Sequence, residues 1–210
     1  MSTLIAIPCM DMIHTPFFQS TLALKLNDDV SFGISSGSLI YDARNSLAQR
    51  AVQEGHDRIL WLDSDMIFGS DFLEKLTEDM DEGMDFVSAL YFKRRNPIRP
   101  VIFKDYGFKQ EGENILSAYA TYYEDYPKDS VFEIAACGFG GVMMKTELVK
   151  KVQAEFGAPF APHPGFGEDL SFCLRARQLG AKLYCDSRIK MGHVALSVVT
   201  EEAYTKGVKL

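Results

Sequence analysis

A short apolar run that ends in two carboxylates is the feature that most constrains the fold. The run extends from Arg58 to Leu62, and Asp63, Ser64 and Asp65 follow it directly. Its unbroken apolar character predicts a strand that is buried on both faces, as in a parallel sheet covered by helices. Because two carboxylates are costly to bury, we expect them where the strand ends, at the sheet edge where α/β proteins bind ligands. Paired oxygen ligands of this kind suit Mg²⁺ or Mn²⁺, which in turn suit a phosphate.

The spacing of the two acids does not define a site by itself. Asp79 and Asp81 have the same spacing, but they lie at the end of a polar helical segment with no apolar strand before it. Context therefore separates the two pairs. On context alone, a metal or phosphate role for Asp63 and Asp65 and a solvated strand end are both open.

The first sixty residues predict a parallel sheet. Strands are expected at residues 2–8, 30–34 and 58–62, with helices at about 16–26 and from about 42 to Gly55. This alternation is typical of right-handed crossovers, which deliver the carboxyl ends of all three strands to one edge. The loop after Pro8, the loop at 35–38 and the acids at 63 and 65 would then line a nucleotide-sized crevice. Neither a P-loop nor a dinucleotide-binding motif occurs in this half.

The second half adds two features with open interpretations. Four cations, Lys93, Arg94, Arg95 and Arg99, follow a predicted strand at 86–92 and form either a solvated loop or a contact to phosphate or an anionic acceptor. Residues 101–130 are aromatic and polar and predict two edge strands with an irregular insert. The remaining expected elements are a helix at 70–82, a strand at 131–137 that Gly138 to Gly141 interrupts before residues 142–144, helices at 146–156 and from 168, and short strands at 182–185 and 188–191.

Composition limits the class of protein. At 210 residues and 47% hydrophobic content, we expect a single domain spanning 1–210. The net charge of −7 disfavours broad binding to nucleic acid or to anionic membranes. Neither a membrane-length apolar run nor a signal segment is present, so a cytoplasmic protein without membrane insertion is expected. The four cysteines lack a C-x-x-C pair, which favours reduced thiols over a disulfide framework or a zinc site.

The order of these motifs resembles the GT-A glycosyltransferases, especially the family 2-like group that includes short phage and bacterial members. The resemblance spans about residues 4–193. It rests on four stretches, Ala43-Arg44-Asn45, Trp61-Leu62-Asp63-Ser64-Asp65, Gly138-Phe139-Gly140-Gly141-Val142-Met143 and Gly167-Glu168-Asp169-Leu170-Ser171-Phe172-Cys173.

The resemblance implies an α/β GT-A (Rossmann-like) fold with a mostly parallel central sheet flanked by helices. Residues 1–92 would form the nucleotide-binding half and residues 93–210 the acceptor and catalytic half. Carried over by position, Pro8, Ser35 and Arg44 would line the base and ribose, Asp63 would approach the ribose or the metal's water, Asp65 and His193 would hold Mn²⁺ or Mg²⁺, Gly140 and Gly141 would let the donor sugar approach the backbone, and Asp169, with Glu168 beside it, would be the general base.

The activity that the resemblance implies is metal-dependent sugar transfer, with inversion, from a nucleotide-diphosphate sugar such as a UDP-sugar. The acceptor is left open between a glycan, a protein, a small molecule and a modified DNA base. A non-catalytic nucleotide-sugar binding module and a nucleotidyltransferase are the alternatives. The second would need a glycine-rich basic signature after the first strand, which is missing. One tension is that a helix N-terminus lowers the pKa of Asp169 and so weakens it as a base.

Overall fold

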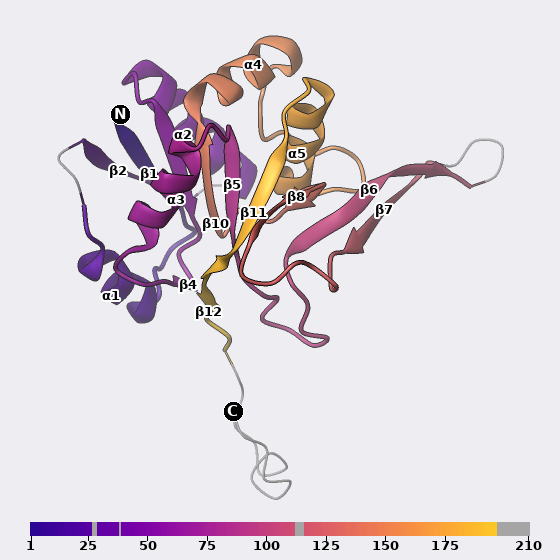
Figure 1. Ribbon diagram of the computed structural model, residues 1–210. Coiled ribbons are helices and arrows are strands. Elements are labelled where there is room, and N and C mark those ends of the chain that lie inside the picture. The colour runs from indigo at the N-terminus through magenta and orange to yellow at the C-terminus, as the bar shows by residue number, and fades with distance from the viewer. Residues whose placement is uncertain (27–28, 38, 112–115, 197–210) are drawn as a thin grey trace, which may run out of the picture.

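A seven-stranded sheet forms the centre of the protein, and helices cover both of its faces (Figure 1). The computed structural model describes residues 1–26, 29–37, 39–111 and 116–196. In the sheet order β2-β1-β3-β10-β5-β11-β8, strands β2, β1, β3, β5 and β11 run in one direction, whereas β10 and β8 run in the other. The bounds are β1 Thr3–Pro8, β2 Val30–Ser35, β3 Arg58–Leu62, β5 Phe86–Leu90, β8 Val131–Ile134, β10 Gly141–Lys145 and β11 Leu183–Lys190.

The unbroken apolar strands are explained by a core on each side of the sheet. Helices α2 (Ile40–Gln53), α4 (Thr146–Phe156) and α5 (Glu168–Gln178) pack on one face. Helices α1 (Thr15–Ala23) and α3 (Phe72–Asp81) pack on the other. Within β3, Ile59 and Trp61 belong to the first core, whereas Leu60 and Leu62 belong to the second. Successive side chains of a strand point to opposite faces, so both sets must be apolar.

The carboxyl ends of β1, β2 and β3 meet at one edge, as the sequence predicted, because these strands are parallel. The backbone N–H of Cys9 donates to the carbonyl of Ser35 at 2.9 Å. At the same edge, β4 (Met66–Ile67) pairs with β12 (Gly192–His193), and His193 lies opposite Met66. This short ladder brings a residue from late in the chain beside the end of β3.

A second, three-stranded sheet consists of β6 (Ile102–Gln110), β7 (Leu116–Tyr122) and β9 (Ala136–Cys137). The β6–β7 hairpin projects to one side of the central sheet (Figure 1). The single strand predicted at 131–137 is divided at Ala135, whose N–H donates to the carbonyl of Phe103 at 2.8 Å. Its first part, β8, joins the central sheet, and its second part, β9, joins the hairpin.

The two short strands predicted at 182–185 and 188–191 form one strand, β11. Asp186 and Ser187 lie between the two predicted strands, and both are buried within β11. The Ser187 hydroxyl donates to the carbonyl of Pro127 at 2.9 Å, while Asp186 accepts from the Arg188 guanidinium at 2.9 Å. Satisfied hydrogen bonds therefore allow these polar residues to continue the strand.

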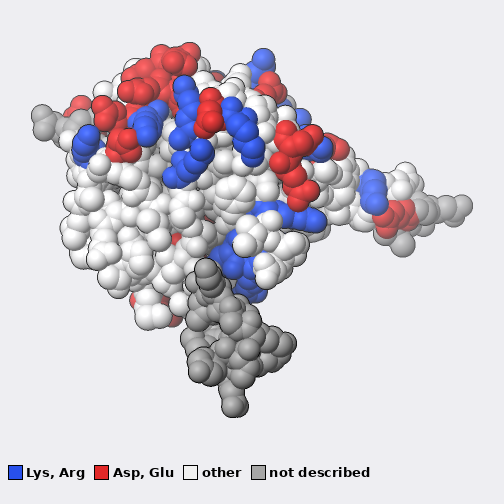
Figure 2. Space-filling view, turned by 60° about the horizontal axis from the view of Figure 1, so that its bottom comes forward, with Lys and Arg blue, Asp and Glu red and all other residues white. Residues whose placement is uncertain are grey.

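The cysteines, the helices and the surface charges of the described residues each bear on the class of protein. Cys137, Cys173 and Cys185 are buried free thiols, and Cys9 is a partly buried one. None of the described helices has both the length and the apolar character to cross a membrane. Figure 2 shows Lys and Arg mixed with Asp and Glu across the upper part of one face, a broad uncharged area at the lower left, and a further group of Lys and Arg near the lower centre.

Candidate functional site

The carboxyl ends of the strands line a cleft of about 340 Å³. Pro8 and Asp63 enter it from the ends of β1 and β3, and Arg44 enters it from α2. Glu168 and Asp169 belong to the first turn of α5. Together with Asp65 and His193, these side chains are the larger part of the predicted site, and the structure brings them together in one cleft.

Arg44 connects the two halves of this site. Its Nη2 donates to Asp63 Oδ1 at 2.8 Å, and its Nε donates to Glu168 Oε1, 124 residues away, at 3.1 Å. The side chain is only 2% exposed, and its guanidinium lies 5.6 Å from the centre of the Trp61 ring and 5.4 Å from that of Phe139. Arg44 lines the cleft as predicted, but these two hydrogen bonds go to carboxylates. It therefore fixes the positions of Asp63 and of the start of α5.

Asp65 and His193 form a second pair in the cleft. Asp65 Oδ2 lies 3.3 Å from His193 Nε2 and also accepts a bond from Arg94 Nη1. Burial by itself would raise the pKa of Asp65, but the hydrogen bond from His193 and the charges of His193 and Arg94 lower it overall. The pKa of His193 is raised, chiefly by its hydrogen bond to Asp65.

The chemistry of this pair fits a divalent cation. His193 Nδ1 lies 2.9 Å from the Phe92 carbonyl, and a proton on Nδ1 leaves the Nε2 lone pair free for a metal. Within the described residues, no group of three or more His, Cys, Asp or Glu is placed to hold a metal ion. Asp63 is engaged by Arg44 through Oδ1. An ion on Asp65 and His193 would therefore complete its coordination with ligand oxygens and water, as Mg²⁺ commonly does beside phosphates.

Asp169 is a carboxyl group with an unusual pKa. Burial and the neighbouring charge of Glu168 raise its pKa to about 7. The N–H of Leu170, which donates to Asp169 Oδ1 at 2.7 Å, opposes that rise. The predicted lowering by the helix N-terminus is thus present but smaller than the effect of burial. A carboxyl group with this pKa is suited to accept a proton near neutral pH.

Three predicted residues lie outside the cleft lining. Ser35 is at the end of β2, beside Cys9. Gly140 donates its N–H to the Tyr91 hydroxyl at 3.2 Å, and a Cβ there would lie 2.9 Å from Tyr91 Cζ. A Cβ at Gly141 would collide with the Met191 side chain. Both glycines are therefore required for close packing against the protein's own side chains, and their contact with a donor sugar stays a prediction.

Sequence reasoning did not single out Tyr91 or Arg94, which also line the cleft. Arg94 belonged to the basic loop, for which both a solvated position and an anion contact were open. The buried position of Arg44 had a usable signal, because Leu47, Ala48 and Ala51 follow it at helical spacing on the buried face of α2. A charged residue in such an apolar stripe is buried only when it is paired.

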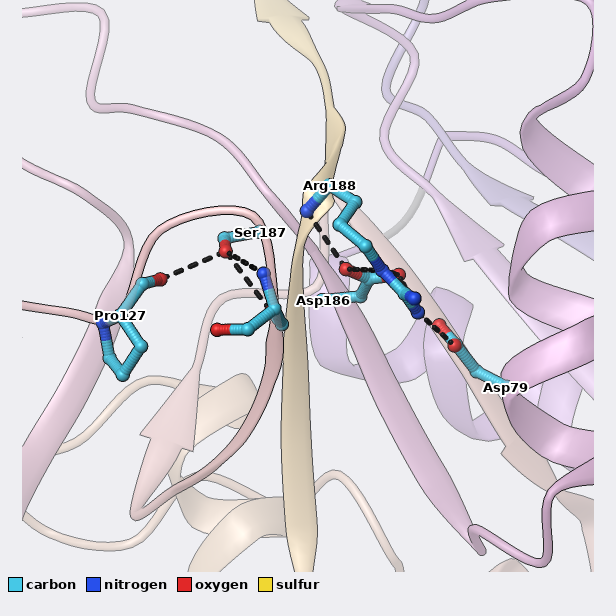
Figure 3. A network of polar contacts seen from close by, with 6 residues as sticks. Asp79, Pro127, Asp186, Ser187 and Arg188 are labelled. Carbon is cyan, nitrogen blue, oxygen red and sulfur yellow. Dashed lines mark hydrogen bonds and ion pairs between the residues drawn. The ribbon is translucent and has the colours of Figure 1, made fainter.

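Asp79 and Asp81, which have the same spacing as Asp63 and Asp65, have partners outside the cleft. Asp81 pairs with Arg58, and Asp79 accepts from Arg188 Nη2 at 3.0 Å. Figure 3 shows Arg188 between Asp186 and Asp79, with Ser187 turned toward Pro127 on the other side of β11. Burial and the adjacent Asp186 raise the pKa of Asp79 to about 7. These acids join α3 to β3 and β11 of the central sheet, and neither lines the cleft.

The backbone is similar to two solved structures. The crystal structure of A197 from STIV has a TM-score of 0.64 and 20% sequence identity, over 93% of this chain and 87% of that one. The crystal structure of GalNAc-T7 with UDP, GalNAc and Mn²⁺ has a TM-score of 0.61 and 11% identity, over 93% of this chain and 44% of that one. This chain thus spans less than half the length of the GalNAc-T7 chain.

At these identities the likeness establishes the fold. No protein-family model and no curated protein sequence matches the chain. The α/β GT-A (Rossmann-like) fold with helices on both faces of a mostly parallel sheet is confirmed.

Proposed function

We propose that this protein is a metal-dependent glycosyltransferase that moves a sugar, with inversion, from a nucleotide-diphosphate sugar to an acceptor. The observation that carries the proposal is one cleft that holds both a cation-type pair, Asp65 and His193, and a carboxyl group, Asp169, whose pKa is about 7. A UDP-sugar is the proposed donor, and the cytoplasm is the proposed location. The UDP and Mn²⁺ in the GalNAc-T7 structure support the choice of donor.

The charges of the cleft support a requirement for a cation. Its lining includes four carboxylates, Asp63, Asp65, Glu168 and Asp169, against two guanidinium groups, Arg44 and Arg94. His193, whose pKa is raised, adds positive charge, and a diphosphate would bring further negative charge beside the four carboxyl groups, where like charges repel strongly. Asp65 and His193 supply the oxygen and nitrogen ligands on which Mn²⁺ or Mg²⁺ would neutralise the diphosphate leaving group.

The protein's own residues provide the remaining chemistry. Asp169 would take the proton of the acceptor hydroxyl while the acceptor oxygen forms a bond to the anomeric carbon and the bond from that carbon to the phosphate oxygen breaks. Attack from the side opposite the leaving group inverts the anomeric carbon. Arg44 holds Glu168 at the start of α5, so it keeps the adjacent Asp169 at a fixed place in the cleft. A glycan, a protein, a small molecule and a modified DNA base remain the candidate acceptors.

The proposal is tested by donor binding with a matched pair of aspartate variants. We expect UDP or a UDP-sugar to raise the melting temperature of the wild-type protein in the presence of Mn²⁺, because a ligand of the native state stabilises it. Asp65→Asn should remove the Mn²⁺-dependent part of that rise. Asp125→Asn is the control, because Asp125 is 76% exposed, pairs with Lys104 and does not line the cleft.

Turnover separates an enzyme from a binding module. Asp169→Asn should keep the UDP- and Mn²⁺-dependent stabilisation and lose donor hydrolysis and transfer. A wild-type protein that binds UDP equally well with Mn²⁺ and with excess chelator would contradict the metal-dependent mechanism. If no nucleotide sugar in a screen raised the melting temperature, that result would contradict the proposed donor class.

A further inference from the structure

The four basic residues of the loop between β5 and β6 have different surroundings. The Lys93 Nζ and the Arg99 guanidinium lie 5.6 and 5.3 Å from the centre of the Tyr122 ring, at the hairpin, and Arg99 also pairs with Glu124 at 3.0 Å. Arg95 is exposed. Arg94 is the member of this set that lines the cleft.

Arg94 already pairs with Asp65, the carboxylate that would hold a cation. Its Nη1 pairs with Asp65 Oδ2, the same oxygen that lies 3.3 Å from His193 Nε2. Asp65 is only 15% exposed, so this oxygen has little space for a further partner. A guanidinium and a metal ion both carry positive charge, so a cation on Asp65 would repel Arg94 and weaken its ion pair with Oδ2.

Backbone hydrogen bonds hold the loop in place, so only the side chain of Arg94 needs to move when it changes partner. The N–H of Lys93 donates to the Arg99 carbonyl at 2.9 Å, and the N–H of Val101 donates to the Tyr91 carbonyl at 3.0 Å. These bonds close the base of the loop on both sides of Arg94. The Arg94 side chain is 43% exposed, which leaves it room to rotate without any movement of the backbone.

We propose that Arg94 is a positioning residue with two partners, Asp65 in the absence of a cation and the diphosphate of the donor once a cation occupies Asp65. The inference rests on the proposed function of the cleft. A diphosphate bound to an ion on Asp65 would lie within reach of a guanidinium that already contacts Asp65, and guanidinium groups form strong paired bonds with phosphate oxygens. The exchange makes the cation and the donor bind cooperatively, because the donor gives the displaced Arg94 a new partner.

The test measures Mn²⁺ binding and UDP binding separately in Arg94→Gln and in the matched control Arg95→Gln. Mn²⁺ affinity without nucleotide is followed by the electron paramagnetic resonance signal of the free ion. UDP affinity is followed by calorimetry at saturating Mn²⁺. Removing a competing, partly exposed ion pair should make Arg94→Gln bind Mn²⁺ alone about threefold more tightly. Removing a charged hydrogen bond to phosphate should make it bind UDP about tenfold more weakly. Arg95→Gln should stay within about twofold of wild type in both.

Opposite changes in the two affinities are the signature of the exchange, since a general loss of structure would weaken both. The inference is overturned if Arg94→Gln matches Arg95→Gln in both measurements, or if it binds both Mn²⁺ and UDP more weakly. It is also overturned if the affinity for Mn²⁺ alone rises while the affinity for UDP is unchanged. Failure of the wild-type protein to bind either Mn²⁺ or UDP would instead refute the proposed function on which the inference rests.

Discussion

Replacing Arg44 by glutamine should destabilise the protein far more than the same replacement at Arg50 on the same helix. Arg44 is 2% exposed and pairs with both Asp63 and Glu168, whereas Arg50 is 40% exposed and pairs with Glu54 one turn away. Arg44→Gln leaves two carboxylates close to Asp169 without a counter-charge. Breaking a buried ion pair in this way costs about 3–5 kcal/mol.

The geometry favours the lower end of that range. The Asp63 side chain is 32% exposed, so water in the cleft can partly solvate its charge once Arg44 is gone. We therefore expect a loss of about 3 kcal/mol in the free energy of unfolding for Arg44→Gln, and of about 0.5 kcal/mol for Arg50→Gln. For a chain of this length, the first value corresponds to a fall in melting temperature of about 6–12 °C.

The pH dependence of this loss has a defined sign. Burial already raises the pKa of Asp63 in the folded state above its unfolded value, and loss of the Arg44 charge should raise it further. Groups with raised pKa values bind more protons in the folded state than in the unfolded state, so stability falls as pH rises through that interval. The destabilisation of Arg44→Gln should thus be larger at pH 8 than at pH 5.5. Urea denaturation of both variants at both pH values measures it, and unfolding energies that agree within about 1 kcal/mol at pH 8 would refute the role of Arg44.

Two further predictions concern carboxyl groups with raised pKa values. Because the pKa of Asp169 is about 7 and a base must be unprotonated, the transfer rate should rise with pH through about 7. Asp169→Asn should lower turnover by about 10²-fold or more. A pH profile of the transfer rate that is flat from 6 to 8 would contradict this role. Because the pKa of Asp79 is also raised to about 7 from an unfolded value near 3.9, wild-type stability should fall as pH rises between these values. Asp79→Asn should remove its part of that slope and leave the part that Asp169 contributes, as melting temperatures from pH 5 to 8 would show; a variant that keeps the full wild-type slope would argue against the assignment.

The first half of the fold was predictable because its signals are local. Apolar runs ending in loop residues marked β1, β2 and β3, and the helices between them required parallel pairing. The place of β10 was not predictable in this way. It lies antiparallel between β3 and β5, and an apolar run shows that a strand is buried without showing its direction or its neighbours.

The candidate site was predictable to the extent that its residues end recognisable elements. Asp65, Glu168 and Asp169 occupy such positions, and they meet in the cleft. The bond from Arg44 to Glu168 joins residues 124 apart in the sequence, and no local pattern specifies it. Similarly, the basic residues of the loop at 93–99 look alike in the sequence. Only the packing around Tyr122 and Asp65 distinguishes Arg94 from its neighbours.

The pairing of β12 with β4 makes the cleft dependent on a late part of the chain. His193 reaches Asp65 only when residues 192 and 193 have been synthesised and have docked on Met66 and Ile67. A chain that ends before residue 192 would lack the imidazole that accompanies Asp65. The cleft is therefore a non-local site, since its Asp65–His193 pair forms only once the chain has brought these two distant residues together.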